Sequence, residues 1–400
     1  MFFDADDSEF SLFTERDIFD LNGDFYIAQG VWNRTKEKFT PTEICARLSS
    51  FIESGVLSFP YKTYSQQELK EDFLSLQAKE ALPLYSSWEC NRLAQTIPLV
   101  YRNRSVYLSQ KLRGGSKVSD QYTQAYRMEV SHLRYPSPSS AWNSPNKFFL
   151  KALLDERLFN GEINNYTLRK AITLRCYEAP QFKPQSAKAV YDFFGAKNVL
   201  DFSAGWGDRL VGFLASGAES YVGIDPNTKL HAPYSQIRDF CAVRDKQTRF
   251  ICAPAEEADL TGVEVDFVFT SPPYFTLERY STESSQSWVR YTHLDAWLHG
   301  FLFPTLSKCW SALKEGGRIA INISDAYTQG QREDICTPML RYMAELGATY
   351  EGVIGYQLAK RPGMNMDNLK SDAIFCEPIF IWSKGVAPEP KWEQDNFFGV

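Results

Sequence analysis

The stretch VLDFSAGWGD, residues 199–208, decides the fold that this sequence predicts. A short apolar run ends at Asp201, two glycines follow at Gly205 and Gly207, and a helical pattern then begins. Glycines in a turn between a strand and a helix allow the backbone to approach a ligand closely. The stretch therefore predicts a ligand-binding loop at the carboxyl end of a β-strand.

Apolar runs and amphipathic stretches alternate on both sides of this loop. The predicted helices cover 187–194, 207–216, 230–243, 297–313 and 338–346, and the predicted strands cover 198–201, 221–225, 248–252, 265–270 and 318–323. Such alternation is typical of a parallel sheet with helices on both faces. Two further strands, over 350–358 and 373–382, are expected to close the sheet as an antiparallel pair.

An acidic residue ends the second predicted strand, at Asp225, 24 residues after Asp201. In nucleotide-binding α/β folds, a carboxylate at this place accepts hydrogen bonds from a ribose diol. The third glycine of the dinucleotide pattern G-x-G-x-x-G is replaced here by Leu210. The pair of acidic residues therefore indicates a nucleoside cofactor and disfavours NAD.

The order of acidic residue, Gly-x-Gly and second acidic residue resembles the class I S-adenosylmethionine-dependent methyltransferases. The resemblance implies an α/β, Rossmann-like mixed sheet with helices on both faces, and S-adenosyl-L-methionine as cofactor. The stretch QFKPQ, residues 181–185, is similar to motif X of this class, which covers the methionine end of the cofactor. The cofactor-binding residues that the resemblance implies are Phe182, Lys183, Asp201, Ser203, Gly205 and Gly207 for the methionine part, Asp225 for the ribose and Glu256 near the adenine.

The stretch TSPPYF, residues 270–275, follows the fourth predicted strand and carries the most specific chemical signal. Two prolines fix the backbone and remove two donors, so the loop offers rigid acceptors. Ser271 and the Pro272 carbonyl can orient the hydrogens of an exocyclic amine, and Tyr274 can hold a base by stacking. Ser271-Pro272-Pro273-Tyr274 resembles motif IV, (D/N/S)-P-P-(Y/F), of amino methyltransferases acting on adenine N6 or cytosine N4. The serine form favours cytosine N4, and these four residues are the predicted catalytic set.

Other reaction types lack the residues that they need. The sequence contains no Pro-Cys dipeptide, so the nucleophilic cysteine of cytosine-C5 methyltransferases is missing. The eight cysteines do not approach CxxC spacing, and we expect no metal site. The four histidines are interpreted as structural or surface residues, because direct attack by an oriented amine needs no histidine.

Charge is distributed unevenly along a chain with a net charge of −6. Residues 1–24 contain eight acidic residues and one basic residue, whereas residues 101–151 contain nine basic and two acidic residues among many aromatic ones. Basic and aromatic side chains together favour a phosphate backbone and its bases, although a solvated face over core aromatics has the same composition. Residues 276–293 are expected to form a substrate loop, with a polar loop lacking any binding role as the alternative. The candidates for nucleic-acid contact are Arg102, Arg104, Lys111, Arg113, Arg279 and Arg290.

The 400 residues predict two or three domains. We expect an N-terminal recognition region over 1–170, mostly helical or α+β, a methyltransferase domain over 171–385 and a C-terminal tail over 386–400. The expected reaction is methyl transfer to an exocyclic amine in DNA, cytosine N4 first, with a flipped base if the DNA is paired. Adenine N6, RNA as substrate, and an inactive fold acting as a binding subunit are the alternatives. An acidic N-terminus and short apolar runs predict a cytoplasmic protein without membrane segments; the oligomeric state is left open.

Overall fold

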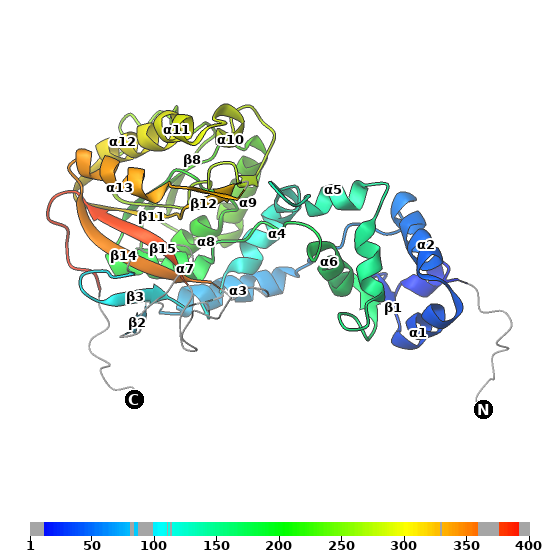
Figure 1. The fold of residues 1–400 in the computed structure, drawn as a ribbon. Helices are drawn as coiled ribbons and strands as arrows, with labels where there is room; N and C mark the ends of the chain where they lie inside the picture. The colour runs from blue at the N-terminus through cyan, green and yellow to red at the C-terminus, as the bar shows by residue number, and fades with distance from the viewer. Residues whose placement is uncertain are drawn as a thin grey trace. The chain divides into compact units, whose positions relative to one another are not determined.

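The computed structural model describes residues 12–80, 84–86, 99–109, 111–112, 114–328, 330–358 and 376–391. The chain divides into two compact units (Figure 1). The first contains Met1–Thr63 and Arg127–Ala179, and the second contains Tyr64–Tyr126 and Pro180–Val400. This division differs from the boundary expected at residue 170, because residues 64–126 belong to the same unit as the central sheet.

A nine-stranded sheet forms the second unit, in the order β2-β3-β14-β15-β11-β9-β6-β7-β8. Its strands are β2 (Leu84–Ser86), β3 (Ser105–Leu108), β6 (Asn198–Asp201), β7 (Ser220–Ile224), β8 (Gln247–Ile251), β9 (Val265–Thr270), β11 (Leu313–Asn322), β14 (Thr349–Gln357) and β15 (Cys376–Ser383). The five strands β6, β7, β8, β9 and β11 are parallel, and β15 is antiparallel to both of its neighbours. The mixed α/β sheet expected from the sequence is therefore confirmed.

Helices cover both faces of the sheet, which explains why its central strands are almost continuously apolar. On β9, Phe267 and Phe269 point to α7 (Pro184–Phe194), where their rings lie 6.2 and 5.7 Å from that of Tyr191. Val268 points the other way, into the core that also contains Leu306 and Met339. Those two residues belong to α12 (Phe303–Ala312) and α13 (Cys336–Glu345), and Figure 1 shows α12 and α13 on the side of the sheet opposite α7 and α8 (Asp208–Ala215).

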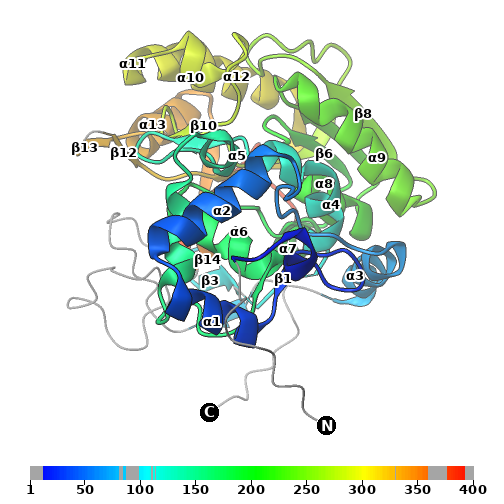
Figure 2. The ribbon, with the colours of Figure 1, turned by 90° about the vertical axis from the view of Figure 1, so that its right-hand side faces the viewer.

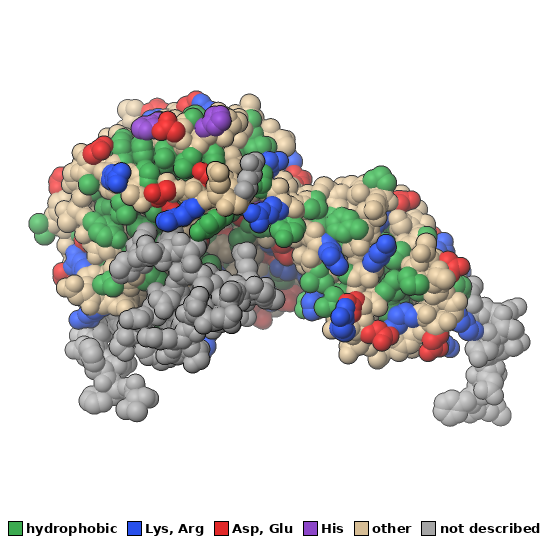
Figure 3. All heavy atoms as spheres, in the orientation of Figure 1, with side chains coloured by type: hydrophobic (Ala, Val, Ile, Leu, Met, Phe, Trp, Pro, Cys, Tyr) green, Lys and Arg blue, Asp and Glu red, His purple; other side chains and the backbone are tan. Residues whose placement is uncertain are grey.

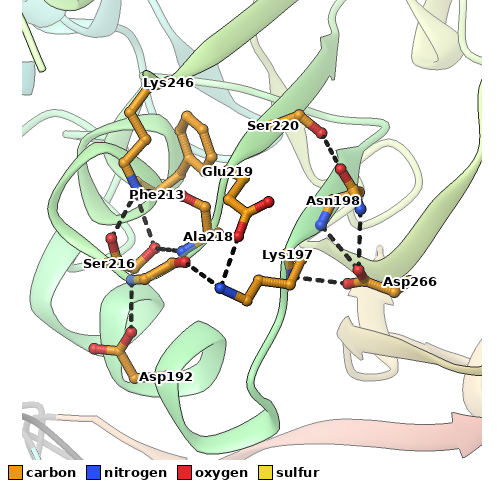
Figure 4. A network of polar contacts seen from close by, with 11 residues as sticks. Asp192, Lys197, Asn198, Phe213, Ser216, Ala218, Glu219, Ser220, Lys246 and Asp266 are labelled. Atoms are coloured by element: carbon orange, nitrogen blue, oxygen red, sulfur yellow. Dashed lines mark hydrogen bonds and ion pairs between the residues drawn. The ribbon is translucent and has the colours of Figure 1, made fainter. Parts of the chain in front are cut away.

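A polar network fixes the amino ends of β6 and β7 (Figure 4). The Asp266 carboxylate accepts hydrogen bonds from the backbone amides of Lys197 at 2.9 Å and Asn198 at 3.1 Å. The Asn198 side chain in turn accepts a bond from Ser220 Oγ at 2.7 Å. Lys246 donates to the carbonyl of Ser216 at 2.7 Å, just past the end of α8. These contacts hold β6 in register between β9 and β7.

Residues 64–126 complete the second unit through α3 (Gln66–Ala78), β3 and α4 (Ser116–Arg127). Strand β3 pairs with β14, where Tyr107 lies opposite Gly355. Ser119 of α4 donates a 2.5 Å hydrogen bond to Asp208, the first residue of α8. Because these contacts join residues far apart in sequence, the local pattern does not reveal them.

The first unit is mostly helical and has its own apolar core around Trp32, Phe51 and Phe149. Its elements are η2 (Glu15–Ile18), β1 (Tyr26–Ile27), α1 (Gln29–Lys38), α2 (Pro41–Glu53), β4 (Ser131–His132), α5 (Pro138–Asn143), η3 (Phe148–Leu154), β5 (Ile163–Asn164) and α6 (Asn165–Thr173). Figure 2 shows α1, α2 and α6. Strands β1 and β5 pair antiparallel, and Thr40 caps α2 by accepting from the Glu43 amide. Nowhere in the described chain does a helix combine the length and the apolar character that crossing a membrane requires.

Candidate functional site

The loop after β6 lies where the strand order of the sheet reverses. From β6 the chain continues to β7 and β8 on one side and then to β9 and β11 on the other. In open α/β sheets, ligands bind at the carboxyl ends of the strands at such a switch point. Gly205 and Gly207 occupy this place with φ of 56° and 76°, which glycine adopts without strain. A Cβ on Gly207 would also lie 2.7 Å from Ile237 Cδ1, so the loop requires a glycine there.

Asp201 lies fully buried at the end of β6, and its hydrogen bonds stabilise the glycine loop. Its carboxylate accepts hydrogen bonds from Arg209 Nε at 2.8 Å and from the Tyr221 hydroxyl at 2.7 Å. The same Arg209 guanidinium also donates to the carbonyl of Ser203. Asp201 thus fixes the backbone course of the loop through Arg209.

Asp225 follows β7 and reaches the same loop. Its Oδ2 accepts from the Gly205 amide at 2.9 Å, and its Oδ1 accepts from the Asn227 amide at 2.9 Å. Burial raises the pKa of Asp225 to about 6, although the two backbone hydrogen bonds oppose the shift. Each carboxylate oxygen has a second lone pair, so the side chain can still accept bonds from a diol.

Glu256 follows β8, and its side chain is only 5% exposed. Its Oε1 accepts from Arg290 Nη1 at 2.7 Å and from the Tyr291 hydroxyl at 3.0 Å. Its Oε2 is buried and has no hydrogen-bond partner. Burial raises the pKa of the Glu256 carboxyl.

Phe182 and Lys183 precede α7 and meet the end of β14. The Phe182 ring stacks on Tyr356 with centroids 4.7 Å apart and an interplanar angle of 14°. The Lys183 amide donates to the Tyr356 hydroxyl at 3.3 Å. Phe182 also meets Phe269 of β9 edge to face at 5.5 Å. The sequence did not reveal Tyr356 as part of this aromatic wall, because β14 is contributed from near the end of the chain.

The loop Ser271–Tyr274 directly follows β9, with Pro272 buried and its neighbours half-buried. Phe275 ends the loop with a φ of 54°, and its amide donates to the Pro273 carbonyl at 3.0 Å. A left-handed conformation costs a non-glycine residue about 1–3 kcal/mol, so packing must hold it. The Phe275 ring packs edge to face on Trp297 at 6.2 Å. The loop is therefore a fixed turn at the carboxyl edge of the sheet.

Residues 276–293 lie against the loops that follow β7 and β8. Glu283 accepts from the Thr228 amide at 3.3 Å, and Ser285 donates to the Pro226 carbonyl at 3.2 Å. The Tyr280 ring lies 5.9 Å from that of Trp206 in the glycine loop. Arg279 lies over the Trp288 ring at 5.0 Å. This segment, expected to be a substrate loop, thus borders the predicted cofactor residues.

The basic residues predicted to contact nucleic acid differ in their surroundings, and the described ones are not gathered into one patch. Arg102 forms ion pairs with Glu351 at 2.8 Å and Glu389 at 2.5 Å. Lys111 is exposed, Arg104 bonds through its backbone to Tyr101, and Arg113 lies outside the described residues. Residues 101–126 of the basic segment belong to the second unit and 127–151 to the first. On the face drawn in Figure 3, Lys and Arg side chains are interspersed with acidic and apolar ones.

The described part of the chain contains no group of His, Cys, Asp and Glu side chains arranged to hold a metal ion.

Three features define the class I methyltransferase fold, which is Rossmann-like: the strand order, the antiparallel β15 between β11 and β14, and the glycine loop at the switch point. This is the fold that the sequence predicts.

A family model described as DNA methylase, N6_N4_Mtase, matches residues 265–395. The match begins at β9 and contains the Ser271–Tyr274 loop. The resemblance to the N4 and N6 amino methyltransferases is therefore confirmed for this part of the chain. No curated protein matches the chain.

Solved structures of methyltransferases are similar at low identity. TrmN from Thermus thermophilus is 16% identical over 50% of this chain and 48% of its own, with a TM-score of 0.34. An rRNA methylase from Streptococcus thermophilus is 13% identical over 52% of this chain and 99% of its own, with a TM-score of 0.31. Magnesium protoporphyrin IX methyltransferase from Synechocystis PCC 6803, solved with bound SAM, is 11% identical over 62% and 94%, with a TM-score of 0.34. The matched region thus spans about half the length of TrmN.

Proposed function

We propose that this protein binds S-adenosylmethionine at the carboxyl ends of β6, β7 and β8 and transfers its methyl group to an exocyclic amine of a base in DNA, cytosine N4 in the first place. The observation that carries the proposal is the Ser271–Tyr274 loop at the end of β9, the strand next to β6. The DNA methylase family model that contains this loop supports the choice of substrate class.

The described residues fit the cofactor. The loop at Gly205 and Gly207 allows close backbone approach, and Asp225 keeps lone pairs for the ribose hydroxyls. Glu256 offers a buried acceptor atom without a partner, as an adenine amino group requires. When bound, S-adenosylmethionine supplies an electrophilic methyl group on a sulfonium centre.

The chain's own residues orient the amine that receives this methyl group. Ser271 and the Pro272 carbonyl accept its hydrogens, which directs the nitrogen lone pair away from them, and Tyr274 holds the base by stacking. S-adenosylmethionine held at the glycine loop would supply the methyl group and leave as S-adenosylhomocysteine, and the methylated amine would release one proton to solvent. A base in paired DNA must leave the stack to reach the loop.

The test incubates the purified protein with S-adenosylmethionine and either duplex DNA or RNA, followed by mass spectrometry of the nucleosides. We expect 4-methylcytosine from DNA. Only N6-methyladenine would overturn the cytosine assignment, methylation of RNA alone would overturn DNA, and no methylated base would favour the binding-subunit alternative.

Tyr274→Ala is expected to lose most turnover while cofactor affinity stays close to that of the unaltered protein, because the ring serves the base. Tyr350→Ala is the matched control, since this tyrosine is 47% exposed at the start of β14. Equal turnover of Tyr274→Ala and the unaltered protein would remove Tyr274 from the site.

A further inference from the structure

A hairpin of two short strands leaves the central sheet beside the Ser271–Tyr274 loop. Strands β11 and β9 are parallel, and Ile321 of β11 lies opposite Thr270, the last residue before that loop. The chain then forms β12 (Ala326–Thr328) and β13 (Gln331–Glu333), which pair antiparallel. Because neighbouring strands lie about 4.8 Å apart, the hairpin begins at the same edge of the sheet as the predicted catalytic residues.

Asp325 fixes the base of this hairpin. Its side chain is 1% exposed, and its Oδ1 accepts hydrogen bonds from the backbone amides of Ile335 at 3.1 Å and Cys336 at 2.9 Å. Its Oδ2 accepts from Arg332 Nε at 3.0 Å and from Arg332 Nη2 at 2.6 Å. One buried carboxylate thus joins the start of the hairpin to β13 and to the beginning of α13.

Tyr327 and Arg332 lie side by side on the outer face of the hairpin. They are directly opposite each other in the register of β12 and β13, so their side chains stand on the same face with Cβ atoms about 4.5–5.5 Å apart. Tyr327 is 45% exposed, and the Arg332 side chain is 48% exposed. Ala326 and Thr328 are buried, as the alternation along a strand requires. The hairpin therefore presents an aromatic ring beside a guanidinium to solvent.

Arg332 keeps donors for a further partner. Two of the five N–H groups of its guanidinium donate to the carboxylate at the base of the hairpin, and its side chain has no other hydrogen bond to a described residue. The nearby acidic side chains are engaged by the chain itself, because Glu333 accepts from the Thr328 hydroxyl and Asp334 accepts from the Thr337 amide at 3.1 Å. The positive end of the α13 dipole offsets the charge of Asp334. A phosphate oxygen matches the donors that remain.

A nucleic-acid strand is the partner that this pair of side chains fits. An exposed ring stacks on a base of any identity, and a guanidinium binds a phosphate with two donors. We propose that residues 325–334 hold the DNA strand beside the base that is methylated, with Tyr327 stacked on a neighbouring base and Arg332 on a phosphate. The inference rests on the proposed function, because it takes the target amine to lie at the Ser271–Tyr274 loop.

The hairpin can reach only bases that are close to the target. Tyr327 follows Ile321 by six positions, a chain length of at most about 22 Å. At about 3.4 Å per nucleotide of a B-form strand, the stacked base lies within roughly six nucleotides of the target base. The contact therefore belongs to the DNA around the methylated base.

Photo-crosslinking tests the contact directly on the full chain. The probe is random-sequence DNA in which 5-iododeoxyuridine replaces thymidine, bound in the presence of S-adenosylhomocysteine. On irradiation, an iodinated base forms a crosslink to an aromatic ring stacked on it. Trypsin releases residues 319–332 as one peptide, in which Tyr327 is the only aromatic residue. We expect this peptide to carry the crosslink in the mass spectrum.

Two tyrosines of similar exposure provide a matched pair of variants. Tyr327→Ala is expected to weaken DNA binding about tenfold by fluorescence anisotropy, because a base loses its stacking partner, and to leave the affinity for S-adenosylhomocysteine unchanged. Tyr327→Phe, which keeps the ring, should bind DNA as the unaltered protein does. Tyr350→Ala is the control, since Tyr350 is 47% exposed at the start of β14, at the opposite edge of the sheet. Equal DNA affinity of the two alanine variants, both shown to be folded by thermal unfolding, would overturn the role of the hairpin.

A failure of the proposed function would give a different result. An unaltered protein that binds neither DNA nor S-adenosylhomocysteine would overturn the function and the inference together. An unaltered protein that methylates DNA but gives no crosslink in residues 319–332 would overturn the inference alone. Crosslinking of iodinated RNA to this peptide, without crosslinking of DNA, would overturn DNA as the partner.

Discussion

Asp225 is the residue whose charge state has the clearest consequence. Burial raises its pKa from 3.8 to about 6 in the folded protein. A raised pKa means that the folded form holds its proton more tightly than the unfolded chain does. The ligand-free fold therefore gains stability as the pH falls from about 6 toward 3.8. The ribose binding that we propose for Asp225 needs the ionised acceptor, so we expect it to be lost over the same range.

Cofactor affinity should consequently be constant above about pH 7 and fall below pH 6, by up to about tenfold per unit. Asp225→Asn should weaken binding by about 1.5–3 kcal/mol at pH 8 and remove the pH dependence. Calorimetric titration with S-adenosylhomocysteine between pH 5 and 8 measures both effects. A dissociation constant of the unaltered protein that does not change with pH would contradict this role of Asp225.

Some of the predicted site residues meet in the fold, whereas their other contacts could not be foreseen from the sequence. The glycine loop and Asp225 meet through the 2.9 Å bond from the Gly205 amide, as the pattern of strand, loop and acidic residue implies. The Asp201 carboxylate, by contrast, accepts hydrogen bonds from Arg209 and Tyr221 of the chain itself. Tyr356, which stacks on Phe182, carries no such signal in the sequence, because only the folded sheet brings β14 to this place.

Among the elements, the segment 276–293, expected to form a substrate loop, packs against the loops after β7 and β8. Its contacts with Thr228, Pro226 and Glu256 place it beside the predicted cofactor residues. Its position in the sequence, directly after the Ser271–Tyr274 loop, could not distinguish a contact with substrate from a contact with cofactor, because partners in the loops after β7 and β8 determine where the segment packs.

The variant Arg290→Ala distinguishes a contact with the cofactor site from a contact with DNA phosphate. We expect cofactor affinity to fall about tenfold, because the buried Glu256 loses the cation that orients it. The salt dependence of DNA binding should stay unchanged. Arg238→Ala is the control, since Arg238 forms a comparable but exposed pair with Asp239 on α9 (His231–Cys241). A salt slope lowered by about one unit would instead show that Arg290 contacts phosphate.

For the molecule as a whole, the sequence predicted the parallel strands of the central sheet, but it did not predict the elements from residues 64–126 that complete the second unit. Strands such as β9 are buried on both faces and therefore appear as continuous apolar runs. The strand β3 has four residues and pairs with β14 nearly 250 positions later, so no local pattern marks it. The expected boundary at residue 170 consequently separated α3, β3 and α4 from the sheet that they complete.

A fragment that begins at residue 171 should therefore lack cooperative unfolding. Removing residues 64–126 leaves the β14 edge unpaired and deprives Asp208 of its bond from Ser119. The full chain should show a sharp thermal transition by circular dichroism and bind S-adenosylhomocysteine, whereas the fragment should do neither. A fragment that melts sharply and binds would mean that residues 64–126 are dispensable for the fold.

The position of β15 has a consequence for the order in which the protein is made. This strand lies between β11 and β14, yet its residues, Cys376–Ser383, are synthesised after those of both neighbours. Until the residues of β15 leave the ribosome, β11 and β14 have no common partner. Strand β3 likewise cannot pair with β14 until β14 has been synthesised. The first unit, by contrast, has all of its residues once Ala179 has been added. Its helical core can thus form early, while the central sheet is completed only when β15 has been added, with its unpaired strand edges exposed to aggregation in the interval.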